Sequence, residues 1–318
     1  MSSVFQEIPP LVAKRVSRLA LLRSSFRRHR MAYLMLVPGV AYFLIFHYYP
    51  MYGLIISFKD FKASLGILGS PWVGLKHFQI LFASEEFYRV FRNTLLINIY
   101  KLIFFFPVPV ILALLINELG SSAAKRSIQT IAYFPHFLSW VVVGGIVYKI
   151  LGFGGIANRL VSALGGEQVS FLSDVRWFRG VLVVSATWKE AGWGTILYLA
   201  ALCTIEPGLY DAAFVDGAGR WKQTLYVSLP GLAGTFAVLL ILRIGGMMST
   251  GFEQIFVLYN PMVYEVGDVF GTYIYRTGLL TRRFSYSTAV GLFQSVVSMI
   301  LIYAANRVAN RMGGHGIW

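Results

Sequence analysis

Cysteine and charge are both scarce in this sequence. The single cysteine, Cys203, excludes an internal disulfide and any metal site built from cysteines, and we predict it to be a small buried residue near a helix end. Charged residues make up only 13% of the 318-residue chain, whereas a soluble domain has about 25%. Hydrophobic residues make up 57%. This balance predicts an integral membrane protein whose apolar faces meet lipid as well as each other.

The sequence also lacks the short motifs of common active sites. It contains no G-x-x-x-x-G-K-[ST] sequence, so we predict that it binds no nucleotide through a P-loop. It contains neither H-E-x-x-H nor G-x-S-x-G, which removes the simplest membrane-protease and lipase hypotheses. No two of the five histidines have the spacing of metal ligands. We therefore predict no catalytic residue, no metal site and no cofactor bound by this chain.

Positive charge is present in excess. Lys and Arg number 28, against 14 Asp and Glu. The basic residues collect at the N-terminus and beside apolar segments, which indicates membrane lipid rather than nucleic acid as the partner. Residues 1–30 place most apolar and basic side chains on different helical faces. They predict a basic amphipathic tail on the cytoplasmic leaflet, with a disordered basic tail as the alternative.

Long apolar segments fill most of residues 31–318, which we predict to form one all-α transmembrane domain. A spanning helix needs about 20 apolar residues. We predict six spans, at Met31–Phe58, Thr94–Asn117, Thr130–Leu151, Gly180–Leu202, Gly234–Leu258 and Ser287–Ala305. Prolines inside or beside them indicate kinks around a pathway, although simple packing kinks are equally common. The segment Phe153–Leu172 predicts a short surface helix flanked by turns.

The distribution of Lys and Arg sets the orientation of the helices. Basic residues collect just ahead of Met31, so we expect the N-terminus to lie in the cytoplasm. An even number of helices returns the C-terminus to the same side. The segment between the fourth and fifth helices, residues 203–232, is then cytoplasmic as well.

That segment is polar and rich in small residues. One helical face is nearly bare of bulk, at Leu209, Ala212, Ala213, Asp216 and Gly217. Gly217 and Gly219 give the chain freedom to leave the helix, and Pro230 fits the first turn of the next one. A bare face lets the surface of another protein approach closely. We therefore interpret residues 203–232 as a coupling loop.

The same stretch resembles the EAA loop of permease subunits in binding-protein-dependent ABC importers. The matching residues are Asp211, Ala212 and Ala213, then Asp216, Gly217 and Ala218, and finally Leu229 and Pro230. Asp211 stands where the family usually has glutamate, which keeps the charge but shortens its reach. Phe46–Phe58, Arg126–Val143 and Gly251–Pro261 are also similar to the polysaccharide-type subgroup of the maltose-type importers. The resemblance implies the type I ABC importer permease fold, with six transmembrane helices and a cytoplasmic coupling helix.

The resemblance also implies a function and a set of partners. A permease of this kind pairs with a second homologous permease, two ATPase subunits and an extracytoplasmic solute-binding protein in the bacterial cytoplasmic membrane. ATP and Mg²⁺ are then expected on the ATPase subunits, into which Asp211–Gly217 would dock. The similar permeases import oligosaccharides, including alginate and pectin fragments.

Several charged residues lie inside the predicted spans, where a charge at the helix centre costs about 2.5–3.5 kcal/mol on insertion scales. They must pair, reach an interface, or line a wet cavity. Aromatic faces beside polar groups suit a sugar site, and Arg243, Glu253 and Gln254 are predicted to share the fifth helix. The candidate pathway residues are Lys101, Trp188, Lys189, Glu190, Trp193, Arg243, Glu253 and Gln254. For Glu190 and Glu253, a structural ion pair between helices is the alternative.

Basic residues outnumber acidic ones in the predicted outer loops and inside the spans, so we expect an acidic oligosaccharide such as an alginate- or pectin-type uronate chain. Binding to lipid phosphates is the alternative explanation for these basic residues. Two rival functions are a polytopic membrane enzyme acting on lipid-linked sugars and an ion-coupled secondary transporter. The enzyme would need an acidic metal–phosphate site that this sequence lacks, and the coupling loop argues against the secondary transporter.

Overall fold

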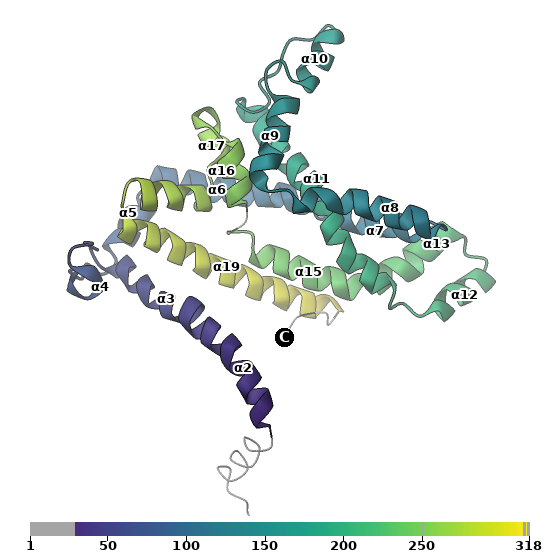
Figure 1. Cartoon of the computed structure of the whole chain (residues 1–318), viewed down its shortest axis with the longest axis horizontal. Helices are drawn as coiled ribbons and strands as arrows, with labels where there is room; N and C mark the ends of the chain where they lie inside the picture. The colour runs from purple at the N-terminus through teal and green to yellow at the C-terminus, as the bar shows by residue number, and fades with distance from the viewer. Residues whose placement is uncertain (1–28, 250, 314–315, 317–318) are drawn as a thin grey trace, which may run out of the picture. The chain divides into compact units, whose positions relative to one another are not determined.

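The computed structural model describes residues 29–249, 251–313 and 316 (Figure 1). Helices account for all the regular structure in these residues, apart from an isolated bridge between Lys59 and Trp72. The helical architecture confirms the predicted all-α class. The chain divides into two compact units, one ending at Ile55 and the other beginning at Ile56. The predicted amphipathic tail at residues 1–30 lies almost entirely outside the described residues and stays a prediction.

The described part of the first unit is a long apolar helix. α2 (Arg30–Phe43) continues through a π turn (Leu44–Tyr48) into α3 (Tyr49–Met51). No residue of α2 is buried within this chain. A helix that is apolar all round is covered in its native setting, and a membrane supplies that cover.

The second unit contains the remaining helices. Those ahead of residue 140 are α4 (Gly66–Gly69), α5 (Lys76–Phe82), α6 (Glu85–Tyr100), α7 (Pro107–Asn117) and α8 (Ser122–Tyr133). Those that follow are α9 (Trp140–Leu151), α10 (Ile156–Ala163), α11 (Val175–Leu202), α12 (Pro207–Val215), α13 (Arg220–Gln223), α14 (Leu229–Gly231), α15 (Ala233–Gly245), α16 (Phe252–Leu258), α17 (Tyr264–Gly267), α18 (Phe270–Ile274) and α19 (Phe284–Gly313). The 3₁₀ turn Tyr52–Phe58 precedes them, and short 3₁₀ or π turns lie between them at Lys101–Phe105, Phe134–Phe137, Thr224–Ser228, Pro261–Val263 and Tyr275–Leu280.

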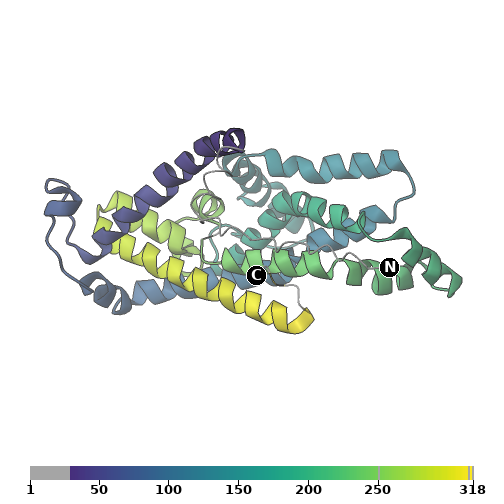
Figure 2. The same cartoon turned by 90° about the horizontal axis from the view of Figure 1, so that it is seen from below.

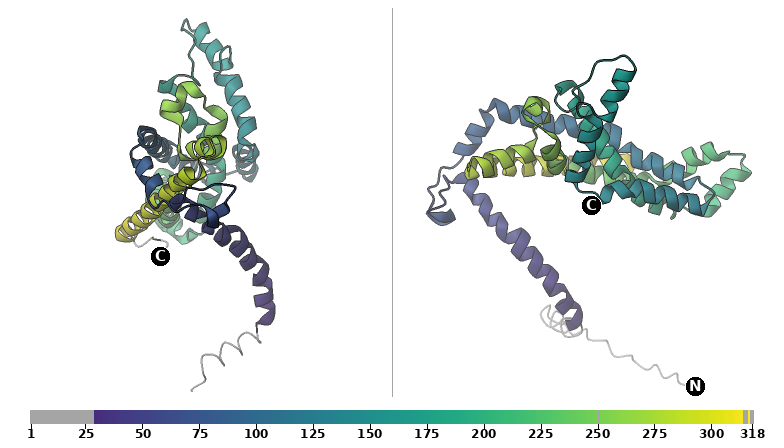
Figure 3. Two further views of the ribbon diagram at one scale, coloured as in Figure 1. Left: turned by 90° about the vertical axis from the view of Figure 1, so that its left-hand side faces the viewer. Right: turned by 45° about the horizontal axis from the view of Figure 1, so that its top comes forward.

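The long helix α11 is the centre of the second unit. It packs against α7 and α8 and also contacts α15, α16 and α17. α15 and α19 lie side by side, as Figures 1 and 2 show. Within this unit, α9 and α10 project to one side, and α12 and α13 lie at one end (Figure 3). Apolar clusters on α11 join Phe178 to Val143 and Ile255, and Tyr198 to Val110.

Local chemistry explains where α11 begins and how closely it packs. Asp174 caps its first turn by accepting a hydrogen bond from the backbone N–H of Arg176 at 2.9 Å. Hydrogen bonds from the side chain and backbone of Arg176 hold the pKa of the Asp174 carboxyl below its ordinary value. Further along, a Cβ at Gly192 would overlap the carbonyl oxygen of Ala132 in α8. Only glycine leaves room for this approach of the two helices.

Four helices are long and apolar enough to cross a membrane: Arg30–Phe58, Glu85–Asn117, Trp140–Ala163 and Phe284–Arg311. Two bent pairs also pass this test, Val175–Leu202 with Pro207–Val215 and Arg220–Gly231 with Ala233–Gly245, with bends of 75° and 56°. If each pair is one span, the described residues contain up to six by length and composition. The predicted number of six stays a prediction.

Two predicted spans are wrong as continuous helices. The predicted helix Thr130–Leu151 is interrupted by the 3₁₀ turn Phe134–Phe137, after which α9 begins. The predicted helix Gly234–Leu258 ends as α15 at Gly245 and resumes as α16. Gly251 precedes α16 with φ at +93°, the left-handed region that favours glycine. Both interruptions adjoin the cavity described below.

Two smaller predictions meet different outcomes. The predicted short helix within Phe153–Leu172 is confirmed as α10. Cys203 follows the last residue of α11, which confirms a position near a helix end, but its predicted burial is wrong because the side chain is exposed. The chain leaves the packed helices at this point and enters residues 203–232.

Candidate functional site

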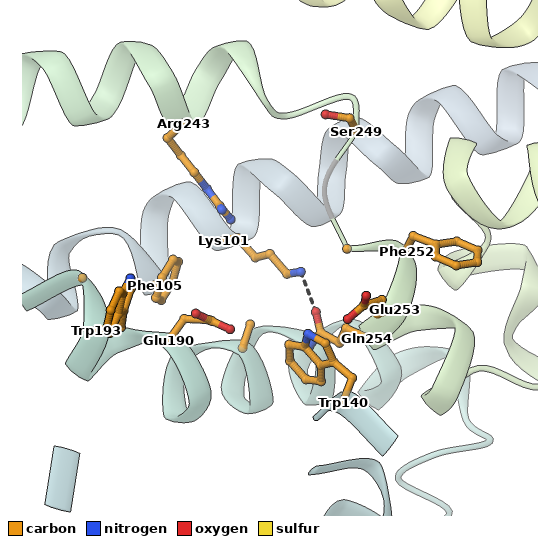
Figure 4. Close-up of a pocket in the computed structure, with 13 residues that line it drawn as sticks. Lys101, Phe105, Trp140, Glu190, Trp193, Arg243, Ser249, Phe252, Glu253 and Gln254 are labelled. Atoms are coloured by element: carbon orange, nitrogen blue, oxygen red, sulfur yellow. Dashed lines mark hydrogen bonds between the residues drawn. The ribbon is translucent and has the colours of Figure 1, made fainter. Parts of the chain in front are cut away.

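A cavity of about 560 Å³ lies beside α11 in the second unit (Figure 4). Its wall comes from the π turn after α6, from α9 and α11, from α15, and from the segment that leads into α16. The charged and amide side chains in the wall are Lys101, Glu190, Arg243, Glu253 and Gln254. The aromatic ones are Phe105, Trp140, Trp193 and Phe252.

Two cations, Lys101 and Arg243, face this cavity from different helices (Figure 4). Lys101 is only 4% exposed, and its Nζ donates a hydrogen bond to Oε1 of Gln254 at 2.6 Å. The guanidinium of Arg243 lies 5.3 Å from the centre of the Phe105 ring. Among the described residues, neither cation has a carboxylate within 4.0 Å. The cavity therefore contains positive charge without an adjacent counter-ion.

Gln254 connects Lys101 to the central helix. Its Nε2 donates to the carbonyl oxygen of Leu182 at 2.6 Å and to Oγ of Ser185 at 2.9 Å. The amide is 1% exposed, so its partners fix its position. Because a lysine ammonium only donates, the Oε1 end must face Lys101. This amide ties α16, α11 and the π turn together at the cavity wall.

Of the two carboxylates in the cavity wall, Glu190 is paired within the protein, whereas Glu253 has no cation within 4.0 Å among the described residues. Oε1 of Glu190 lies 3.1 Å from Nζ of Lys189, and its Oε2 lies 2.7 Å from Nδ1 of His136. Lys189 is 5% exposed and also donates to the carbonyl oxygen of His136 at 2.7 Å. Within the described residues, Glu190 thus takes part in an ion-pair network that joins α11 to the 3₁₀ turn after α8. For Glu190, this network supports the alternative considered from the sequence, which was a structural ion pair between helices.

An aromatic wall completes the cavity. The indole of Trp193 stacks on the ring of His136, with centroids 4.4 Å apart and planes at 5°. Phe137 meets Trp193 edge-on at 6.0 Å. Trp193 is 46% exposed within this chain, so part of the ring stays open. Flat aromatic faces beside hydrogen-bonding groups match the two kinds of surface on a sugar ring.

The structure brings most of the predicted pathway residues together, but not all of them. Every candidate except Trp188 and Lys189 lines the cavity. Trp188 lines a separate apolar cavity between α9 and α11, and Lys189 is held under the wall by Glu190 and His136. The prediction that Arg243, Glu253 and Gln254 share one helix is wrong, because the chain breaks between α15 and α16.

Sequence reasoning missed several residues of this site. Phe105 and Trp140 line the cavity, and His136 supports it from behind. Their signal was the run FPHFLSW, in which a proline beside aromatic residues marks a break in an apolar segment. Gly245, Gly246 and Gly251 give a similar signal for the break after α15.

The predicted coupling residues lie on a surface segment that consists of α12, a tight turn, α13, the π turn Thr224–Ser228 and α14. Asp211, Ala212, Asp216, Gly217, Leu229 and Pro230 are exposed, and Ala213 is half-buried. Gly217 has φ at +76° and therefore uses the freedom predicted for it, whereas Gly219 has an ordinary φ of −68°. Pro230 lies in the first turn of α14, as predicted. The hydroxyls of Tyr210 and Ser228 lie 2.9 Å apart and join the two sides of the segment.

No group of three or more His, Cys, Asp or Glu side chains in the described part of the chain could hold a metal ion.

The surface of the coupling segment is partly apolar, because Phe214 is 75% exposed and Val215 is 84% exposed. Exposed apolar side chains next to small residues form a surface suited to another protein.

Comparisons with known proteins extend the resemblance over most of the sequence. Residues 105–314 match the family described as "Binding-protein-dependent transport system inner membrane component". Protein LplB of Bacillus subtilis (strain 168) is 47% identical over 296 residues, which cover 93% of each chain. The polygalacturonan/rhamnogalacturonan transport system permease protein YteP of the same organism is 47% identical over 287 residues, 90% of this chain and 89% of its own length.

Solved structures give the same result. A chain in the crystal structure of a bacterial ABC transporter involved in the import of the acidic polysaccharide alginate is 42% identical, with a TM-score of 0.85. It matches 92% of this chain and 99% of its own. A chain in a bacterial alginate ABC transporter in complex with alginate pentasaccharide-bound periplasmic protein is also 42% identical, with a TM-score of 0.86 over 93% of this chain and 99% of its own. The resemblance to permease subunits of ABC sugar importers and the all-α permease fold that it implies are confirmed, whereas the six spans and the cytoplasmic coupling helix stay predictions.

Proposed function

Because the chain belongs to the inner-membrane components of binding-protein-dependent transport systems, and is a multi-pass permease of an ABC sugar importer, we propose that its sugar is an acidic oligosaccharide of the alginate or pectin type. The observation that carries this proposal is the pair of cations in the cavity. Lys101 and Arg243 have no carboxylate within 4.0 Å among the described residues. A uronate chain would bring that counter-charge.

The other lining residues support a saccharide. Phe105, Trp140 and Trp193 offer flat apolar surfaces, and Glu253 offers a directional polar group. Sugar rings have apolar faces and hydroxyl edges, so they use both kinds of surface at once. The proteins to which this chain is similar include a transport-system permease for polygalacturonan and rhamnogalacturonan and an importer of alginate. Those substrates belong to the relatives, and they support the same class here.

The coupling segment has a direct physical connection to this cavity. One end of the segment follows α11, which carries Glu190 and Trp193, through a bend of 75°. The other end leads through a bend of 56° into α15, which carries Arg243. At a rise of about 1.5 Å per residue, Trp193 lies about 14 Å along α11 from its last residue. Movement of α12 would therefore displace two walls of the cavity.

This connection supports the partners expected from the family. We propose that Asp211–Gly217 docks into an ATPase subunit and that closure of two ATPases, with ATP and Mg²⁺ bound there, moves α11 and α15. A second homologous permease and an extracytoplasmic solute-binding protein complete the proposed importer. The rival hypothesis of an enzyme acting on lipid-linked sugars is not favoured, because the matched relatives are transport permeases.

Uptake measurements test the acidic preference. Arg243→Ala should lower kcat/KM for a uronate oligosaccharide by about 10-fold or more, because a hydrogen bond to a charged group contributes about 1.5–3 kcal/mol. Lys149→Ala is the matched control, since Lys149 is an exposed basic residue in the last turn of α9 and does not line the cavity. Competition by neutral glucans as strong as by uronate oligomers would reject the proposal.

We also propose that both termini lie in the cytoplasm. Single cysteines at Ser25 and Leu164, in a background with Cys203→Ser, should react oppositely with an impermeant thiol reagent on intact cells. Leu164 is 88% exposed beside α10 and suits labelling, whereas Ser25 lies outside the described residues. Labelling of the Ser25 position from the outside would overturn the orientation.

A further inference from the structure

Lys101 in the cavity wall and Lys189 behind it are almost equally buried but have different partners. Lys101 is 4% exposed and Lys189 is 5% exposed. Lys189 has a carboxylate oxygen of Glu190 at 3.1 Å and the carbonyl oxygen of His136 at 2.7 Å. The acceptor of Lys101 among the described residues is the uncharged amide oxygen of Gln254, at 2.6 Å. The charge of Lys189 is thus paired within the protein, and that of Lys101 is not.

This difference decides which lysine can respond to the charge of a ligand. A buried ammonium without a counter-ion is unfavourable, and a nearby carboxylate removes much of that cost. An ammonium has three donors, and the bond to Gln254 takes one of them. Lys101 lines the cavity, whereas Lys189 does not. An arriving carboxylate would therefore meet a lysine with both charge and donors to offer.

Gln254 holds Lys101 in place without neutralising it. The amide is anchored on the far side by its bonds to Leu182 and Ser185, so Oε1 stays directed at Nζ. A glutamate at the same position would have almost the same shape but would supply the missing counter-charge. The choice between glutamine and glutamate at position 254 therefore determines whether the charge of Lys101 is available to an acidic ligand.

We propose that Lys101 is the specificity-determining residue that binds the carboxylate of an acidic sugar, and that Gln254 is the residue that positions it. The proposal rests on the proposed function, and it specifies which residue contacts the charged group of the substrate. In the bound state a carboxylate oxygen of the substrate accepts a hydrogen bond from Lys101 Nζ while Gln254 Oε1 keeps its own bond to the same nitrogen. Such charge-assisted bonds are shorter and about twice as strong as neutral ones.

The test compares two substrates of equal length, a uronate oligosaccharide and the same oligosaccharide with its carboxyl groups reduced to alcohols. The readout is the ratio of their kcat/KM values for uptake by the complete importer. Gln254→Glu should lower the ratio by about 10-fold or more. A purely structural role for Gln254 would lower both values alike and leave the ratio unchanged, which would overturn the inference.

Two further variants keep the test decisive. Asn260→Asp makes the same amide-to-carboxylate change at a 3₁₀ turn outside the cavity, and should leave the ratio as in the wild type. If Gln254→Glu does not accumulate, Lys101→Met should lower the ratio and Lys101→Arg should retain most of it. An unchanged ratio in Lys101→Met would reject the inference. A wild-type protein without preference for the uronate would instead reject the proposed function.

Discussion

The cavity and the coupling segment are built in opposite ways. The cavity draws its wall from several separate parts of the chain, and partners within the protein hold some of its polar residues, as Gln254 holds Lys101 and the buried Lys189 holds Glu190. The coupling segment is one continuous stretch, and most of its predicted contact residues are exposed. The protein itself holds the cavity in shape, whereas the coupling segment presents a surface for another protein to complete.

This contrast has a consequence for mutations. A substitution in the coupling segment should damage transport without damaging the fold, because few internal contacts depend on those residues. A substitution behind the cavity wall should damage the fold and transport together. A substitution within the wall should change substrate affinity more than stability.

The largest effect is expected in the coupling segment. Ala213→Trp places bulk on the small-residue face of α12 and should abolish transport, while the amount of protein in the membrane stays near wild type. Gly217→Ala is the companion variant, because φ at +76° strains any other residue by about 1–2 kcal/mol without adding bulk. Uptake and substrate-stimulated ATP hydrolysis of the complete importer are the measurements. Full stimulation with Ala213→Trp would show that this face makes no contact.

A smaller effect, on stability first, is expected where α11 meets α8. Gly192→Ala should destabilise the protein by about 1–3 kcal/mol, because the added methyl group overlaps the carbonyl oxygen of Ala132 and forces the helices apart. Gly180→Ala is the control on the same helix, where the added atom meets nothing within 4 Å. Thermal unfolding of the purified importer should separate the two variants. Equal melting temperatures would contradict the close packing of α11 and α8.

The smallest effect is expected at the aromatic wall. His136→Gln removes the ring stacked on Trp193 and should raise KM by an amount equivalent to about 0.5–1.5 kcal/mol. His136→Phe keeps a ring and loses the bond to Glu190, so its KM should stay closer to wild type. The melting temperature of each variant controls for general damage. A higher KM in the phenylalanine variant than in the glutamine variant would mean that the bond to Glu190, and not the stacking, positions Trp193.

The contrast between the two regions also explains what could be predicted from the sequence. The coupling segment was recognisable because its residues are consecutive and its small side chains recur at helical spacing. The cavity wall joins residues that are far apart in the sequence, such as Lys101 and Gln254. No local sequence pattern connects such residues. The failure at Trp188 was avoidable, since five residues of helix turn it about 140° away from Trp193. The breaks at Phe134–Phe137 and between α15 and α16 are marked by proline or glycine in the sequence, but each lies within an apolar run of spanning length, and that length favoured a continuous helix.

The importance of the two uncompensated cations is tested most directly by a structure of the complete importer with a uronate oligosaccharide trapped inside. We expect carboxylate oxygens within hydrogen-bond distance of Lys101 Nζ and of the Arg243 guanidinium, with a sugar ring against the open part of Trp193. A saccharide that crosses this chain along another route, with Lys101 still bonded only to Gln254 and no carboxylate near Arg243, would contradict this expectation.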